Sequence, residues 1–225
     1  MPQSEPRFFR IAAVMADPTR SRMLAALLGG EHRSAGELAT VAGVTAQAAS
    51  TQLAQLVDSA LVTMRQQGRH KYFALADAEV AHALEALSLV AERDTVSARW
   101  QRPSYKPLKH ARRCYNHMAG ELGVAQFEML MRHGHLQAGE EGLRLSESGR
   151  AWTIELGIAL PRKPDARFAY PCMDWSERKD HLAGTLSRAL LEHYLEKHWL
   201  TADRDSRALN LTPKGQRELL PLLGV

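Results

Sequence analysis

The chain has 225 residues, of which 45% are hydrophobic and 24% charged, the ordinary range for one large globular domain or two modest ones. It has no apolar run of about 18 residues, and its first twenty residues lack the apolar core of a secretory signal, so neither a membrane span nor export is predicted. Its two cysteines cannot build a disulfide framework, which favours a cytoplasmic protein, and its net charge of +4 arises in residues 101–225.

Three helix starts follow one another in the first part of the chain. Asp17 is placed as an N-cap directly before Pro18, which suits a first helical position. Ser34 and Glu37 form a capping-box pattern for a second, short helix, and Thr45 is placed as the N-cap of a third. Two short helices joined by a tight turn that contains glycine predict a helix-turn-helix.

The third predicted helix, residues 45–60, has one apolar face and one polar face. Gln47, Thr51 and Gln55 lie opposite the apolar face, and Ser50 and Gln52 flank them. The only formal charge is Asp58, near the helix end. Such a face can hydrogen-bond to base edges without repelling phosphate, as expected of a recognition helix.

A β-hairpin is predicted next, with strands at 61–66 and 70–75 and a turn at Gly68. Its tip is basic and suits phosphate or minor-groove contacts. The basic side chains are Arg65, Arg69, His70 and Lys71. A long helix follows from Asp77, so the order of elements is that of a winged helix.

The run ADPTRSRMLAALLGG and its continuation to residue 77 resemble the arsenical-resistance-repressor (ArsR) family of bacterial transcription factors. The resemblance covers residues 11–95 and includes the DPTR motif, SAGELA, the S-x-x-L-x-x-L pattern of the third helix and the wing motif GRHKY. Ala60 stands where the family usually has glycine. The resemblance implies a homodimer, paired through the first and last helices, that binds a pseudo-palindromic DNA operator and usually represses transcription.

The resemblance also bears on individual residues. It implies that Ser50, Thr51 and Gln52 face DNA, and Gln47 and Thr45 belong to the same surface by periodicity and position. The family's metal sensors carry a Cys-x-Cys on the first helix of the helix-turn-helix, where this chain has ELATVAGV without a thiol. A known metal site of the family is therefore not predicted, nor is any cofactor.

The remaining chain, 101–225, is predicted to form a second domain after a basic linker, 99–113, that could add phosphate contacts. Within it, NHMAGELGVAQFEMLMRHGHLQ and DHLAGTLSRALLEHYLEKHWLT match at an offset of 64, which predicts two repeats, about 111–160 and 172–225. Each repeat is interpreted as helix, hairpin and helix, with Asn116 and Asp180 as the first N-caps and Ser146 and Thr212 as later ones. The joining segment, 159–174, is predicted to be a loop.

Cys114 and Cys172 are the only thiols and allow three interpretations. They could be inert core residues, or a redox or sulfur-sensing pair activated by nearby basic residues. They could also bind a metal if the two repeats face each other, with Cys114, His117, Cys172, Asp174 and His181 as the candidate ligands. Because His117 recurs at His181 whereas Cys114 aligns with Arg178, the cysteine and the histidine are interpreted as separate features.

Together these patterns predict a mainly α fold with small β-hairpins (α+β), built from a winged-helix domain, 1–100, and a repeat-built C-terminal domain, 101–225. The predicted function is a non-enzymatic, sequence-specific transcriptional regulator that binds double-stranded DNA and is released by a signal such as a thiol reagent, a metal or an organic ligand. The alternative is a winged-helix module for protein interaction without operator binding.

Overall fold

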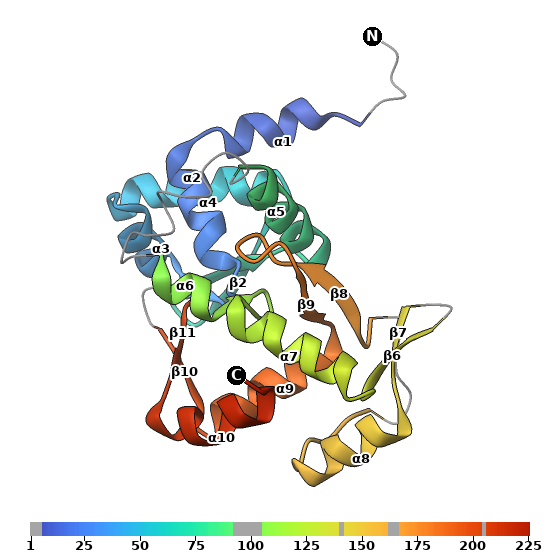
Figure 1. Cartoon of the computed structure of the whole chain (residues 1–225). Helices are drawn as coiled ribbons and strands as arrows, with labels where there is room; N and C mark the ends of the chain where they lie inside the picture. The colour runs from blue at the N-terminus through green and yellow to red at the C-terminus, as the bar shows by residue number, and fades with distance from the viewer. Residues whose placement is uncertain (1–5, 92–104, 140–141, 162–166, 204–205) are drawn as a thin grey trace. The chain divides into compact units, whose positions relative to one another are not determined.

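The computed structural model describes residues 6–91, 105–139, 142–161, 167–203 and 206–225, which form two compact units, Met1–Leu84 and Glu85–Val225 (Figure 1). The first is a winged helix-turn-helix, and the second is a mixed α/β region rich in hairpins. The predicted domain boundary near residue 100 lies outside the described residues.

In the described residues, the first unit contains four helices and a small sheet. A fifth helix follows and continues past Leu84, where the second unit begins. The helices are α1 Phe8–Met15, α2 Pro18–Leu27, α3 Ala35–Ala42, α4 Ala46–Asp58 and α5 Ala78–Ala91, and the strands are β1 Arg33–Ser34, β2 Val62–Gln67 and β3 His70–Leu75. The sheet order is β1-β3-β2, with both pairings antiparallel. The predicted helix-turn-helix and wing are therefore confirmed.

Local capping explains where these helices begin. The Asp17 carboxylate accepts hydrogen bonds from the backbone N–H groups of Thr19 and Arg20, and Ser34 and Glu37 make the complete capping box. Strand β1 was not predicted, because two residues are too few to show an alternating pattern.

The core of the first unit lies where α2, α3 and α4 meet the hairpin. Its side chains are almost all apolar and buried: Met23, Leu24, Leu27, Leu38, Ala49, Leu53, Leu56, Val62, Phe73 and Leu75. Because Leu53 and Leu56 face this core, the opposite side of α4 is left to solvent.

The second unit repeats the order hairpin, helix, hairpin, helix after the short helix α6 Lys106–His110. The first series is β4 Arg112–Cys114, β5 His117–Ala119, α7 Glu121–Arg132, β6 Leu136–Gly139, β7 Gly142–Leu145 and α8 Glu147–Glu155. The second is β8 Tyr170–Met173, β9 Asp180–Ala183, α9 Thr185–Glu196, β10 Leu200–Ala202, β11 Leu209–Leu211 and α10 Pro213–Leu223. One apolar cluster joins both series.

Two sequence predictions for this unit were wrong at the start of each series. Asn116 lies in the turn between β4 and β5, and Asp180 begins β9, so neither caps a helix; the N-caps are Gly120 and Gly184. The chain before each glycine is extended because it pairs with the preceding strand. The later N-caps, Ser146 and Thr212, are confirmed.

Two connecting segments also differ from their predictions. Tyr170–Met173, expected in a loop, is strand β8; Pro171 is tolerated in this two-stranded sheet. The end of the predicted basic linker folds as α6 and β4, and Arg112 is fully buried, so its side chain cannot contact phosphate. Within the described residues, every helix is too short or too polar to cross a bilayer.

Candidate DNA interface and cysteine–histidine cluster

The exposed side of α4 carries hydroxyl and amide groups in its first two turns. Gln47, Ser50 and Thr51 are all exposed. The Ser50 hydroxyl donates to the Ala46 carbonyl oxygen at 3.0 Å, and that of Thr51 to the Gln47 carbonyl oxygen at 3.3 Å. Their oxygen lone pairs remain available as acceptors on this surface.

Two predicted contact residues are already engaged within the unit. Gln52 is half-buried, and its Oε1 accepts a hydrogen bond from Arg20 Nη1 at 2.7 Å. The same Arg20 nitrogen donates to Oε1 of Gln55 at 2.5 Å. The Thr45 hydroxyl accepts from the Ala48 backbone N–H as the helix cap. In the first two turns of α4, the exposed polar side chains that are not hydrogen-bonded to another element of the described chain are therefore Gln47, Ser50 and Thr51.

The wing places its basic side chains in solvent. The exposed residues are Arg65, Arg69, His70 and Lys71. Arg69 Nε lies 3.3 Å from His70 Nε2, and Arg65 pairs across the hairpin with Tyr72. No acidic residue occurs between Val62 and Leu75. The hairpin therefore presents positive charge only.

The recognition helix and the wing are neighbours in the same unit. A pocket of about 250 Å³ lies between them and is lined by Ser50 and Leu53 of α4 and by Met64, Lys71 and Phe73 of the hairpin. Because both elements line this pocket, the recognition helix and the wing lie side by side in the first unit.

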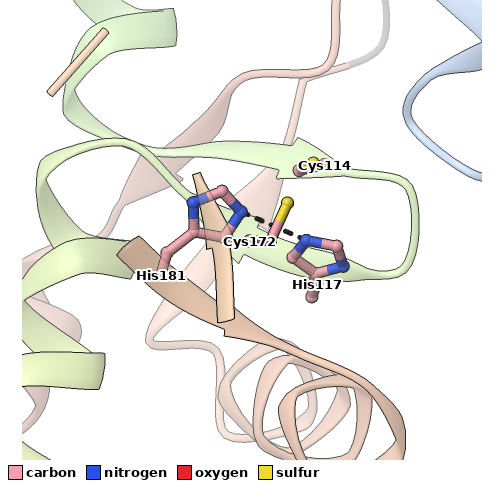
Figure 2. A group of neighbouring side chains, drawn as sticks. All are labelled: Cys114, His117, Cys172 and His181. Atoms are coloured by element: carbon pink, nitrogen blue, oxygen red, sulfur yellow. Dashed lines mark hydrogen bonds between the residues drawn. The ribbon is translucent and has the colours of Figure 1, made fainter. Parts of the chain in front are cut away.

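In the second unit, Cys114, His117, Cys172 and His181 converge from two hairpins (Figure 2). Their ligand atoms all lie within 4.8 Å of one another, and Nε2 of His117 is 3.1 Å from Nε2 of His181. Cys114 is the cross-strand partner of His117 in β4–β5, and Cys172 is that of His181 in β8–β9.

This geometry corrects the interpretation that the cysteine and the histidine are separate features. Cys172 stands opposite His181 as Cys114 stands opposite His117, although the sequence comparison set Cys114 against Arg178. The histidines are 64 positions apart and the cysteines 58, because the segment between the cysteine and the histidine is six residues longer in β8–β9 than in β4–β5. A cysteine shortly before the histidine in both segments was the signal that could have shown this.

Asp174 lies behind His181 rather than among the converging ligand atoms. Its Oδ2 is 3.3 Å from His181 Nδ1 and accepts a hydrogen bond from the Gly120 N–H at 2.6 Å. Its Oδ1 accepts from Arg112 Nη2 at 2.9 Å and from the Ser176 hydroxyl at 2.7 Å. The carboxylate therefore holds the His181 ring from the side opposite the cluster.

Arg112 is the main residue of this environment that the sequence did not identify. Its guanidinium is fully buried, lies 4.2 Å from the ring centroid of Trp175 and pairs with Asp174. Burial alone would raise the pKa of Asp174, but His181 and the charge of Arg112 hold it well below its usual range.

The same contacts set the protonation of the cluster. The hydrogen bond to Cys172, together with burial, raises the pKa of the Cys114 thiol to about 12. Burial would lower the pKa of His181, but its proximity to the Asp174 carboxylate and to Cys114 raises it to about 9. The raised pKa favours the thiol form of Cys114 over the thiolate.

The known proteins to which this chain is similar include transcriptional regulators. Residues 15–65 match the family model described as "Helix-turn-helix domain". The chain is 35% identical over 213 residues to the uncharacterized HTH-type transcriptional regulator YdfF of Bacillus subtilis (strain 168), covering 94% of each chain.

Other matches cover a smaller share of the chain. The chain is 40% identical over 87 residues to the HTH-type transcriptional regulator CmtR of Mycobacterium bovis, covering 38% of this chain and 73% of CmtR. A crystal structure of a possible transcriptional regulatory protein (fragment 1-100) from Mycobacterium bovis is 28% identical, with a TM-score of 0.36, covering 38% of this chain and 91% of that one. With the near full-length likeness to YdfF and its own DPTR, helix-turn-helix and wing motifs, the chain belongs to the ArsR family of helix-turn-helix transcriptional regulators and carries an additional C-terminal region.

Proposed function

We propose that this regulator is a cytoplasmic homodimer that binds a pseudo-palindromic DNA operator, represses transcription and is released by a signal received in its second unit. The observation that carries the proposal is the exposed face of the first two turns of α4, which has polar but uncharged side chains and belongs to the same unit as a purely basic wing. One α4 of each protomer would enter the major groove, with half-sites about 34 Å apart.

The division of labour follows from the chemistry of the two surfaces. Gln47 can donate to and accept from base edges, and the hydroxyl oxygens of Ser50 and Thr51 can accept from them, so these residues would set sequence preference. The wing cations would contact phosphate, which adds affinity and salt dependence but little sequence information.

The homodimer is supported by exposed apolar side chains on the helices through which the family pairs. On α1, Phe8 is 75% and Phe9 71% exposed. On α5, Leu87 and Val90 are also exposed. Large apolar groups at these positions favour burial in an interface between copies of the chain.

For the second unit we propose two repeats, 111–160 and 172–225. The proposal is supported by matching helix starts. The side chain of Ser146 accepts from the Gly149 N–H and that of Thr212 from the Gly215 N–H, and each glycine lies against the backbone carbonyl of the residue before the preceding hairpin, His135 or Trp199. The two series also supply the matching pairs Cys114–His117 and Cys172–His181. This unit is therefore the proposed receiver of the signal, without catalytic activity of its own.

DNA binding is tested by fluorescence anisotropy with duplexes from the protein's own promoter region and with scrambled duplexes. Wild type should prefer the promoter duplex, and Thr51→Ala should reduce that preference by about 1–3 kcal/mol, or roughly 5- to 150-fold. Thr40→Ala, an exposed threonine on α3, is the control and should keep the preference. Unchanged preference in Thr51→Ala would remove α4 from base recognition.

The alternative is a winged-helix module that binds protein rather than DNA. It predicts equal, weak binding to promoter and scrambled duplexes at every salt concentration. A wild-type preference for the promoter duplex that survives physiological salt would exclude it.

A further inference from the structure

We propose that Cys114, His117, Cys172 and His181 form a closed, tetrahedral binding site for one zinc ion in the second unit. The first argument is the convergence of four suitable ligand atoms. In a zinc tetrahedron with Zn–N of about 2.0–2.1 Å and Zn–S of about 2.3 Å, neighbouring ligand atoms lie roughly 3.3–3.8 Å apart. Here the two imidazole nitrogens are 3.1 Å apart, and all four atoms lie within 4.8 Å of one another.

The second argument is how the backbone presents these ligands. In each hairpin the cysteine and the histidine stand directly opposite each other on paired strands. Side chains in such cross-strand positions share one face of the sheet, with Cβ atoms about 4.5–5.5 Å apart. Each hairpin therefore acts as a two-ligand clamp, and strands β5 and β9, which lie against each other, bring the clamps together.

The third argument is the environment of His181. Histidines that bind metals usually donate their second ring nitrogen to a carboxylate, which fixes the tautomer and the ring orientation. The Asp174 carboxylate lies 3.3 Å from His181 Nδ1, which leaves Nε2 directed at His117. Arg112 and the Gly120 N–H hold that carboxylate in place.

Burial and ligand type decide which ion the site fits. Cys114, His117 and His181 are 1%, 3% and 0% exposed, and Cys172 is partly exposed, which gives the ion a route in. Two thiolates neutralise one divalent cation, so the bound site would bury no net charge. Sulfur and imidazole ligands in a tetrahedron select zinc over magnesium or calcium, and four protein ligands leave no open position for catalysis.

The test uses the full-length, tag-free chain, stripped of metal with a chelator and then titrated with Zn²⁺ against a chromophoric competitor. We expect one zinc per chain by elemental analysis, and we expect Co²⁺ to give the intense visible bands of a tetrahedral site with a thiolate charge-transfer band. Cys172→Ser and His117→Gln should each weaken zinc binding about a hundredfold or more. His133→Gln, beside His135 in the same unit, is the matched control and should bind as wild type.

The histidine variant separates this site from a simple thiol pair. A pair of cysteines that only forms a disulfide should keep its reactivity in His117→Gln, and zinc should not protect it from alkylation. Protection of both cysteines by Zn²⁺ in wild type, lost in His117→Gln, supports the site. Substoichiometric zinc in the wild-type chain, or an octahedral cobalt spectrum, overturns the proposal even if a variant fails to fold.

Discussion

His117 and His181 are 64 positions apart in the chain, yet their Nε2 atoms face each other at 3.1 Å in the interior of the second unit. Each stands opposite a cysteine on its own hairpin, so one close contact brings together two Cys–His pairs. The second unit therefore concentrates its ligand chemistry where the two hairpins meet, whereas the first presents polar and basic groups on its surface.

The wing should contribute affinity more than sequence preference. Because Arg69 is exposed at the hairpin tip and Arg side chains neutralise phosphates, Arg69→Ala should weaken binding to promoter and scrambled duplexes by similar factors. The slope of log K against log salt should become less steep by about 1. Anisotropy titrations across a salt series measure both quantities. Arg150→Ala, exposed on α8, should change neither.

Ala60 should be replaceable by glycine with a gain in stability. It has φ of 59°, a left-handed conformation that costs an L-residue about 1–2 kcal/mol. Ala60→Gly relieves that strain but loosens the unfolded chain, so the net gain should be about 0.5–1 kcal/mol, measurable as a higher midpoint in urea denaturation. Ala48→Gly, inside α4, should lose about 1 kcal/mol. If Ala60→Gly lowers the free energy of unfolding as Ala48→Gly does, Ala60 is not strained.

Gly120 should tolerate no side chain. Its φ is 82°, and an added Cβ would lie 2.5 Å from the carbonyl oxygen of Lys109, which is backbone and cannot rotate away. Gly120→Ala should destabilise the second unit by about 3 kcal/mol or more, since strain and overlap add. Gly134→Ala, with φ of 68° but open space around it, should lose only about 1 kcal/mol. If Gly120→Ala and Gly134→Ala lose the same free energy of unfolding in chemical denaturation, the overlap between the added Cβ and the Lys109 carbonyl oxygen does not occur.

Glu85 should make the second unit sensitive to acid. Burial alone would raise the pKa of Glu85, but the charge of Arg207, which hydrogen-bonds to it, lowers the pKa below 4.5. A lowered folded-state pKa stabilises the fold above the unfolded value, and this stabilisation is lost as the pH falls below about 4.5.

Substitution at Glu85 tests this directly. Glu85→Gln should cost about 3 kcal/mol at pH 7, because it removes the buried carboxylate that is hydrogen-bonded to Arg207, and the difference from wild type should shrink as the pH drops below 4.5. The exposed Glu192, paired with Arg188 at 2.8 Å, provides the control, since Glu192→Gln should change stability by less than about 0.5 kcal/mol. A constant difference across pH would rule out Glu85 as the titrating group.

Much of the fold could be predicted because its signals act over three or four residues. Asp17, Ser34, Thr45, Ser146 and Thr212 all cap the helices that their positions indicated. A cap needs only a side-chain oxygen and a free backbone N–H nearby, so the local sequence determines it. The helical spacing of apolar residues likewise predicted the two faces of α4, and two strand-like runs around the Gly68 turn predicted the wing.

The tertiary structure decided what the cysteines and histidines do. Strands β4 and β5 have three residues each, too few for a period to show, so His117 was expected on a helix. The longer β8–β9 connection hid the correspondence of Cys172 with Cys114. Cross-strand pairing and burial depend on contacts between distant segments, and only the folded chain brings these four side chains together.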